Sequence, residues 1–512
     1  MLAAVCREMR HPKDKVLATR LANARDPGHI ARLRANGSLA SKSIDLTVVS
    51  GRAARPSIHV RSASARDAYP HGVAGDRGTI AVCARMPGMT AYASAFTLLF
   101  ALLLIAHTAA HLWLDMRQLR HVGAHRAQVP TAFAGQISLP EHQKAADYTA
   151  AKLRFGQVHL LWEAACLLGW TLLGGLNALN HAIISTFGNG WISGLLLLGA
   201  VGWIQSLLDL PFGYWRTFRL EARFGFNRST RALWVSDVLK GWLLGAVLMA
   251  PLAAAVLAIM DHSGGLWWLW AWAVWVAFSL LMMIIYPTWI APRFNRFEPL
   301  QDRNLHQAIT ALMQRCGFAA KGLFVMDGSK RSAHANAYFT GLGKSKRVVF
   351  FDTLMTRLSE GELLAVLAHE LGHFKRGHIP KRMVMMFALA ALGLFVLAWL
   401  STQPWFYLGL GVMPSLSGSN SALALVLFAM VTPLPMFFLT PLMSAGSRRH
   451  EFEADAYAAE QANGQDLAQA LIKLTQDNAS TLTPDPMYVR FYYSHPPTLA
   501  RLQRLGHSGA SA

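Results

Sequence analysis

The sequence predicts an α-helical integral membrane protein with about seven transmembrane helices and a small α+β domain outside the bilayer. Of its 512 residues, 53% are hydrophobic and only 15% are charged. The hydrophobic residues, which include 16 Trp and 20 Met, gather in long tracts instead of spreading over several small cores. A tract of roughly 20 apolar residues is long enough for a helix to cross a bilayer. This composition excludes an ordinary soluble enzyme.

The net charge of +20 raises the question of a nucleic-acid partner. The sequence holds no C-x-x-C finger, no RNP pattern and no basic helix with interleaved aromatic residues, so we expect no nucleic acid. Lys and Arg that flank membrane spans on their cytoplasmic side explain the excess of positive charge. The four cysteines are far apart and predict neither a metal-ligand spacing nor a disulfide framework.

Residues 1–88 are rich in Arg, Ala and Ser and show no sustained hydrophobic period, so we expect little packed structure there. The first apolar tract begins near Ala91, too late for a secretory signal, whose apolar region lies within the first ~30 residues. Met86 and Met89 stand just before this tract. We therefore expect residues 1–88 to be a basic, disordered extension or the product of a misassigned start.

Apolar tracts long enough to span a membrane follow one another from there. They lie near residues 91–114, 157–178, 191–211, 232–259, 266–290, 383–401 and 421–443. The segments 115–156, 212–231, 291–382 and 444–512 are basic, whereas the loops 179–190, 260–265 and 402–420 contain no Lys or Arg. Because basic loops stay in the cytoplasm, this alternation predicts seven spans with a cytoplasmic C-terminus. It also places the basic tail on the opposite face, which favours a mature chain that starts near Met89.

The segment between the fifth and sixth spans is the expected soluble α+β domain. Residues 305–316 predict a helix, 322–327 and 346–352 predict strands, and Ala333–Thr340 predicts a further strand paired through the turn at 341–343. The expected organisation is thus an extension at 1–88, spans one to five in 89–290, the soluble core in 291–382, spans six and seven in 383–443, and a C-terminal helical segment in 444–512.

A metal-binding pattern lies near the end of this soluble domain. Ser359 and Glu362 form a capping box that opens a helix running to about Arg376. His369 and His373 are four residues apart, so they share one face of this helix and can bind a single ion.

Glu370 follows the first histidine in an H-E-x-x-H sequence. In zinc peptidases of this pattern the carboxylate accepts a proton from water whose pKa zinc lowers to about 7. We therefore expect Glu370 to be the general base for hydrolysis.

A catalytic zinc ion usually takes three protein ligands and leaves one position for water. Downstream of the seventh tract, Glu451 can supply the third ligand, and Asp455, one turn later on the same face, can hydrogen-bond a ligating imidazole. Glu453 is a rival ligand that points about 200° away from Glu451 on a helix, so only one of the two can face the metal. The pairing with Asp455 favours Glu451, although geometry alone leaves the choice open.

These residues resemble the type 1 CAAX prenyl endopeptidases, integral-membrane zinc metalloproteases that include the yeast a-factor-converting enzyme. The similarity runs from about residue 92 to 507. It is carried by His369–His373, Ser447–Ala458, Ser332–Phe339, Leu210–Phe218, Glu221–Phe226 and Ser494–Pro497. Residues 1–88 have no counterpart in the family.

The resemblance implies seven long helices around a large chamber, with a small α+β zinc metalloprotease domain on the cytoplasmic side. It also implies that Glu451 is the third ligand and that Asn336 and His495 lie beside the substrate carbonyl, where they can stabilise an oxyanion. The edge strand formed by Ala337, Tyr338 and Phe339 would bind an extended peptide by strand pairing. The alternative for this segment is a covered sheet edge.

The leading hypothesis is a membrane-embedded endopeptidase with one Zn²⁺ per chain, a polypeptide substrate and membrane lipid around it. The resemblance implies a substrate with a C-terminal CAAX sequence and a prenylated cysteine. The Ala- and Arg-rich composition suggests a bacterial inner membrane, for which quality control of membrane proteins is the alternative role. A transporter, a channel or a peptide-binding chaperone would instead carry a structural zinc site, which four protein ligands normally close. Three ligands and a base favour catalysis.

Overall fold

The chain is described by a computed structural model that covers residues 87–340, 345–415 and 418–506 and three strands nearer the N-terminus. Contacts divide it into two units, Met1–Val82 and Cys83–Ala512. In the first unit, β1 (Arg32–Arg34), β2 (Ser43–Val49) and β3 (Ser57–Ala63) form an antiparallel sheet. Apart from these strands, residues 1–86 are not described. The expectation of little packed structure in residues 1–88, and that of a start near Met89, therefore lie outside the described residues.

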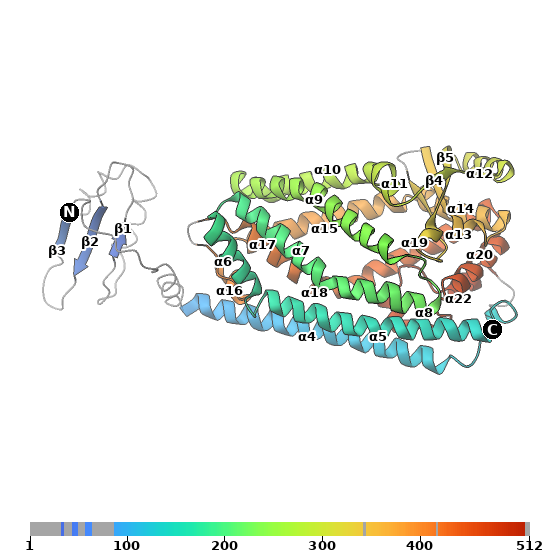
Figure 1. Ribbon diagram of the computed structural model, residues 1–512, viewed down its shortest axis with the longest axis horizontal. Helices are drawn as coiled ribbons and strands as arrows, with labels where there is room; N and C mark the ends of the chain where they lie inside the picture. Colours follow the sequence, from blue (N-terminus) through green and yellow to red (C-terminus); the bar gives the residue numbers. More distant parts are fainter. Residues whose placement is uncertain are drawn as a thin grey trace. The chain divides into compact units, whose positions relative to one another are not determined.

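The second unit is mostly helical and contains the expected membrane spans (Figure 1). Five helices are long and apolar enough to cross a membrane: α4 (Pro87–Ala124), α7 (Trp191–Trp215), α9 (Arg231–His262), α10 (Trp267–Ile285) and α15 (His378–Leu400). Two bent pairs complete the set: α5 (Leu139–Trp170) with α6 (Gly175–Phe187), and α17 (Ser421–Val431) and α18 (Pro433–Phe437) with α19 (Thr440–Gln461). If each bent pair is one span, the described residues hold seven, as predicted.

The helices differ from the apolar tracts in length and continuity. The second expected span, 157–178, contains a 47° bend between α5 and α6, where Gly174 adopts a φ of +81° that favours glycine. A 66° bend separates α17 and α18 from α19, and α19 begins at Thr440, before the boundary expected at residue 444. Hydropathy marks only the apolar part of a helix, so it does not report how far the polar turns continue.

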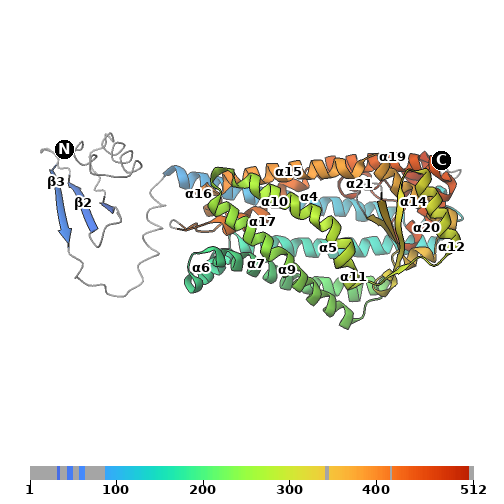
Figure 2. The ribbon, with the colours of Figure 1, turned by 90° about the horizontal axis from the view of Figure 1, so that it is seen from above.

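Short π-helical stretches, Arg216–Glu221 and Tyr286–Ile290, extend α7 and α10 into α8 (Ala222–Phe224) and α11 (Ala291–Phe294). Helices α4, α5, α7, α17 and α18 surround a cavity of about 610 Å³. Seen from above, the long helices run side by side and the short elements gather at the end that carries α14 (Glu360–Lys375) (Figure 2).

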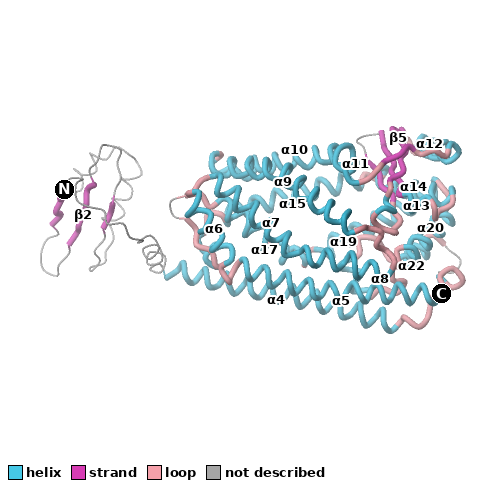
Figure 3. Tube along the Cα trace, viewed as in Figure 1, coloured by secondary structure: helices cyan, strands magenta, loops and turns pink. Residues whose placement is uncertain are grey.

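A small four-stranded sheet lies at this same end of the bundle (Figure 3). Its order is β4 (Phe297–Pro299), β5 (Ala319–Met326), β7 (Ser345–Phe351) and β6 (Ala337–Thr340). Strand β7 is parallel to β5 and antiparallel to β6, with Ala337 opposite Phe350. The expected strand Ala333–Thr340 forms only from Ala337 onward, and it is an edge strand. Strand β4 was not predicted, because three residues are too few to give a periodic signal.

One hydrophobic core joins this sheet to the neighbouring helices. It holds buried residues of α12 (Arg303–Arg315), α13 (Asp352–Met355), α14, α19 and α20 (Gly464–Asp477), including Ile309, Leu323, Val348, Leu367, Leu371 and Leu471. Two further helices, α21 (Pro486–Tyr492) and α22 (Thr498–Arg504), close the C-terminal segment, and α16 (Pro404–Gly409) lies at the other end of the bundle.

The start of α14 follows the predicted capping box. The backbone N–H of Ser359 donates to the Glu362 carboxylate at 2.7 Å, and the N–H of Glu362 faces the Ser359 hydroxyl at 3.4 Å. Lys473 of α20 also donates to Glu362, at 2.7 Å. The helix is therefore fixed at its first turn both locally and by a neighbouring helix.

Helices α14 and α19 approach closely at a glycine. A Cβ added to Gly372 would lie 3.1 Å from the Cα of Ala454 and 3.2 Å from the carbonyl oxygen of Ala454 and the Cβ of Tyr457. These are backbone atoms and a Cβ, so they cannot move aside without moving α19.

We predict that Gly372→Val destabilises the protein by about 1–3 kcal/mol, because the added methyl groups force the two helices apart. Thermal unfolding of the detergent-purified protein measures this loss. Gly446→Val on α19 is the matched control, since a Cβ at Gly446 would meet no atom within 4 Å. Equal unfolding temperatures for the two variants would contradict the close contact.

Candidate metal centre

Helices α14 and α19 bring three potential metal ligands together. The Nε2 atoms of His369 and His373 lie 3.3 Å apart. The Glu451 carboxylate of α19 reaches both rings, with one oxygen 3.5 Å from Nε2 of His369 and the other 3.3 Å from Nε2 of His373. Among the described residues this is the one group of three or more His, Cys, Asp or Glu whose ligand atoms all lie within 4.8 Å of one another.

The hydrogen bonds around this group fit a cation between the three side chains. Nδ1 of His369 lies 2.8 Å from Asp455, so a neutral His369 carries its proton on Nδ1 and a lone pair on Nε2. In that state, a cation between the two Nε2 atoms and the Glu451 carboxylate would have all three as ligands. One carboxylate oxygen of Glu451 is buried and has no hydrogen-bond partner with suitable geometry in the described structure. This same oxygen lies 2.7 Å from Nδ1 of His495, and a metal ion held by the two histidines would give it a further partner.

Asp455 is held in turn by Arg501 of α22. The Arg501 guanidinium donates from Nε to one Asp455 oxygen at 2.8 Å and from Nη2 to the other at 2.5 Å. Its Nη1 lies 3.9 Å from Glu451. Both side chains of the Asp455–Arg501 pair are buried, so they form a bidentate ion pair inside the protein.

Burial lowers the pKa of the His369 imidazole, but its contacts with Asp455 and Glu451 raise it by more, so this pKa lies above its ordinary value. Burial likewise lowers the pKa of Arg501, whereas the hydrogen bond and charge of Asp455 raise it, and the net pKa is also above its ordinary value. Both shifts have the same origin. The carboxylates at this site favour positive charge on the groups beside them.

Glu370 lies on α14 next to His369 and is half-buried. Its carboxylate makes no hydrogen bond or ion pair with any described residue, although its charge acts on Arg501. A carboxylate in this condition is free to accept a proton from a bound water.

His495 and Asn336 differ in how they meet the cluster. The Nδ1 atom of His495 lies 2.7 Å from Glu451, although the His495 side chain is 66% exposed. Asn336 is exposed and precedes β6, where its side-chain oxygen accepts the backbone N–H of Ala337 at 2.8 Å. The structure therefore joins His495 to the metal cluster but gives no contact between Asn336 and the cluster.

Glu453, the rival ligand, does not join the three ligand atoms. One of its oxygens lies 3.1 Å from Nε2 of His378, and the other accepts from Nε of Arg449 at 3.0 Å. The helix separates it from Glu451, which explains why only one of the two faces the histidines.

The predicted substrate strand lies beside the metal helix. The ring of Phe339 on β6 is 6.0 Å from that of Phe374, the residue after His373. Tyr338 meets Phe351 edge to face at 6.4 Å. Burial, together with the nearby Tyr286, raises the pKa of Tyr338 to about 12, so its hydroxyl stays protonated and can donate a hydrogen bond.

Two residues of this region were missed in the sequence. Arg501 follows His495 by six positions, and the only available signal was a basic residue in a short, leucine-containing helix near the C-terminus. His378 stands five residues after His373, beyond the end of the metal helix, and nothing in the spacing indicates that the chain turns back there.

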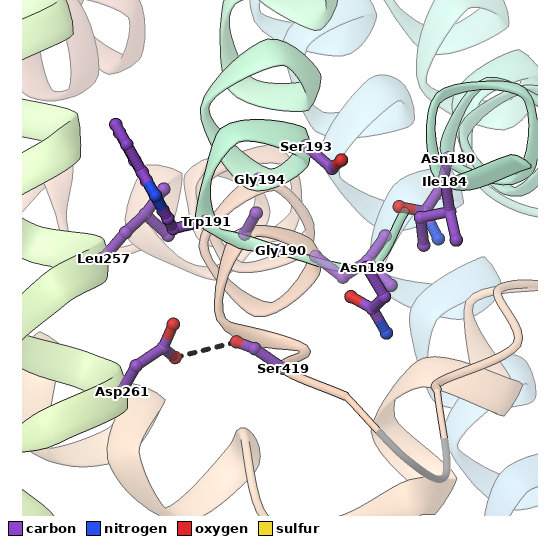
Figure 4. Close-up of a pocket in the computed structure, with 12 residues that line it drawn as sticks. Asn180, Ile184, Asn189, Gly190, Trp191, Ser193, Gly194, Leu257, Asp261 and Ser419 are labelled. Atoms are coloured by element: carbon purple, nitrogen blue, oxygen red, sulfur yellow. Dashed lines mark hydrogen bonds between the residues drawn. The ribbon is translucent and has the colours of Figure 1, made fainter. Parts of the chain in front are cut away.

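A separate pocket lies at the end of the bundle opposite α14 (Figure 4). Asp261 there accepts hydrogen bonds from the hydroxyl groups of Ser419 and Ser421, both at 2.7 Å. It contains none of the residues of the metal cluster. These hydrogen bonds tie α9 to the first residue of α17 and to the segment just before it.

We predict that Arg501→Met destabilises the protein by about 3–5 kcal/mol, because it leaves the buried Asp455 carboxylate without its partner. Chemical unfolding of the purified protein measures the loss. Arg504→Met on the same helix is the control, since Arg504 is exposed and lies over the ring of Phe452. If the two variants unfold alike, the ion pair does not stabilise this site.

Comparisons with known proteins agree with this architecture. Residues 118–296 match the family model described as CAAX prenyl protease N-terminal, five membrane helices, and residues 299–508 match the model of peptidase family M48. A CAAX prenyl protease 1 homolog from Arabidopsis thaliana is 36% identical over 405 residues, which cover 77% of this chain and 93% of the relative. CAAX prenyl protease 1 of Saccharomyces cerevisiae is 37% identical over 295 residues, covering 55% of this chain and 65% of the relative.

The fold is also similar to a solved structure. The crystal structure of S. mikatae Ste24p matches with a TM-score of 0.76 and 31% sequence identity, over 80% of this chain and 99% of that one. The M48 family implies a metal ion, and the cluster of His369, His373 and Glu451 fits one. The chain therefore belongs to peptidase family M48, together with the CAAX prenyl protease 1 homologues, and is a multi-pass integral membrane metalloendopeptidase that acts on polypeptides.

Proposed function

We propose that the chain is a zinc endopeptidase in which His369, His373 and Glu451 bind the metal and Glu370 is the general base. The observation that carries this proposal is the convergence of two Nε2 atoms and a carboxylate at 3.3–3.5 Å from one another. Ligands about 2.0–2.1 Å from a tetrahedral zinc ion lie at about this separation. Three protein ligands leave a fourth position open, which favours catalysis over a structural zinc site in a transporter, channel or chaperone.

When bound, zinc would polarise the scissile carbonyl and lower the pKa of a water molecule. Glu370 lies on α14, pairs with no other described residue, and would accept the proton of that water and pass it to the leaving amine. Asp455 keeps the proton of His369 on Nδ1, so that Nε2 can bind the metal. His495, next to Glu451, and Asn336, at the start of β6, are proposed to hold the carbonyl oxygen as negative charge develops on it.

The substrate would bind as an extended chain along β6. This strand is at the sheet edge, where its outward N–H and C=O groups can pair with a peptide backbone. Ala337, Tyr338 and Phe339 would then line the peptide, and the contact of Phe339 with Phe374 brings this strand next to the metal helix.

We propose that the substrates carry a C-terminal CAAX sequence with a prenylated cysteine. The names of the relatives support this class, and the 610 Å³ cavity between the membrane helices is lined mainly by apolar side chains that would suit an isoprenyl chain. Quality control of membrane proteins, with unmodified peptides as substrates, is the alternative.

We further propose that the metal centre faces the cytoplasm. The basic segments 115–156, 212–231 and 291–382 support this orientation, because positively charged loops are retained there. The inner membrane of a bacterium is the proposed location, on the basis of the Ala- and Arg-rich composition.

The catalytic function is assigned to segments 291–382 and 444–512 and the cavity to the helices of 89–290 and 383–443.

The orientation predicts that a cysteine introduced at the exposed Gln503, in a cysteine-free background, reacts with a membrane-impermeant maleimide only when the cytoplasmic face is accessible. Labelling is compared between right-side-out and inverted vesicles. Reaction in right-side-out vesicles alone would place the metal centre on the other side.

We predict that Glu370→Gln lowers kcat for peptide cleavage by about 10²–10⁴-fold, as expected when a general base is lost. Phenanthroline should abolish cleavage by the wild-type protein, and zinc should restore it. Glu360→Gln, at the exposed first turn of the same helix, is the control and should cleave at the wild-type rate.

The same assay with farnesylated and plain peptides of one sequence tests the substrate class. A higher kcat/KM for the farnesylated peptide is the expected result, and equal values would favour quality control. Wild-type cleavage rates in Glu370→Gln would show that this glutamate is not the base.

A further inference from the structure

A second hydrogen-bonded group lies directly behind His373. Nδ1 of His373 is 3.0 Å from Nδ1 of His378, whose side chain is only 4% exposed. His378 is the first residue of α15, and the turn between α14 and α15 passes through Gly377 at a φ of +68°. Such a turn favours glycine and lets the chain reverse, so that His378 returns to the metal-binding face of α14.

Residues of α19 hold the other side of the His378 ring. Nε2 of His378 lies 3.1 Å from the Glu453 carboxylate, and Arg449 donates to the second oxygen of that carboxylate at 3.0 Å. The ring of His450 stacks on that of His378, with centroids 4.1 Å apart and an angle of 11° between planes. The position and the plane of the His378 ring are therefore both fixed.

These contacts allow one arrangement of protons. Nε2 of His373 faces Glu451 and His369, so a neutral His373 that binds a metal there carries its proton on Nδ1. This N–H points at His378, whose Nδ1 must then accept and whose proton must be on Nε2. The Nε2–H of His378 then donates to Glu453. Each ring nitrogen of His373 and His378 thus has a partner.

We propose that His378 and Glu453 are positioning residues that fix the tautomer and orientation of the metal ligand His373. The proposal rests on the metal-binding role of His373 in the proposed function. It also assigns a role to Glu453, which lies close in sequence to the third ligand but accepts a hydrogen bond from His378, two rings away from the metal site. Partners of this kind typically change metal affinity by about 10–100-fold when they are lost.

The arrangement differs from that at His369, which donates to the carboxylate of Asp455. At His373 the direct acceptor is an uncharged ring, and the carboxylate lies one residue further away. A neutral acceptor orients the ligand without placing a further negative charge beside the already acidic cluster.

The test compares two substitutions that separate hydrogen bonding from packing. His378→Phe keeps a ring to stack on His450 but removes the acceptor. His378→Asn loses the ring, but its side-chain amide oxygen is bonded to Cγ as Nδ1 is in histidine. This oxygen can accept a hydrogen bond from His373. The zinc dissociation constant is measured by chelator competition on full-length protein in detergent, together with the visible spectrum of the cobalt-substituted protein and kcat and KM for a peptide.

We expect His378→Phe to raise the zinc dissociation constant by about 10–100-fold, to alter the cobalt spectrum and to lower kcat with little change in KM. His378→Asn should recover most of the zinc affinity. Glu453→Gln, which can still accept a hydrogen bond from His378, should bind zinc more tightly than Glu453→Leu.

Wild-type zinc affinity in His378→Phe, or equal losses of affinity in both His378 variants, would overturn the inference. Failure of the wild-type protein itself to bind zinc would instead overturn the proposed function, and this inference with it.

Discussion

The close approach of α14 and α19 at Gly372 is the constraint on which the site depends. A Cβ there would lie only 3.1 Å from the Cα of Ala454, so any side chain would require the two helices to shift apart. Glu451 and Asp455 project from α19 toward the two histidines of α14 because of this contact. Helix α19 also carries Glu453 to His378, the first residue of α15. One helix contact thus sets both the ligand positions and the hydrogen bonds behind them.

The second constraint is charge. Glu370, Glu451 and Asp455 bring three carboxylates into one region, and two of them are almost completely buried. The buried guanidinium of Arg501 offsets part of this negative charge, and a bound metal ion would offset more of it. His495, whose side chain is 66% exposed, contacts the cluster from the solvent side. The polar centre is therefore closed by α22 on one side and accessible on the other.

Much of this architecture could be predicted from the sequence because it depends on local pattern. The apolar tracts predicted seven spans, which agrees with five long helices and two bent pairs, and Ser359 with Glu362 marked the start of α14. His369 and His373 follow from helical spacing alone. Glu451 and Glu453 could not be separated by spacing, since the choice depends on which face of α19 meets α14. Arg501 and His378 were missed because each reaches the site through a turn that hydropathy and motifs do not report.

The central claim is that His369, His373 and Glu451 hold one zinc ion and leave a position open. X-ray absorption at the zinc edge of the purified, zinc-loaded protein tests it most directly. We expect four light-atom ligands at about 2.0–2.2 Å, with the multiple-scattering signature of two imidazoles and two further oxygen donors. A sulfur shell at about 2.3 Å, or a site without imidazole, would contradict it.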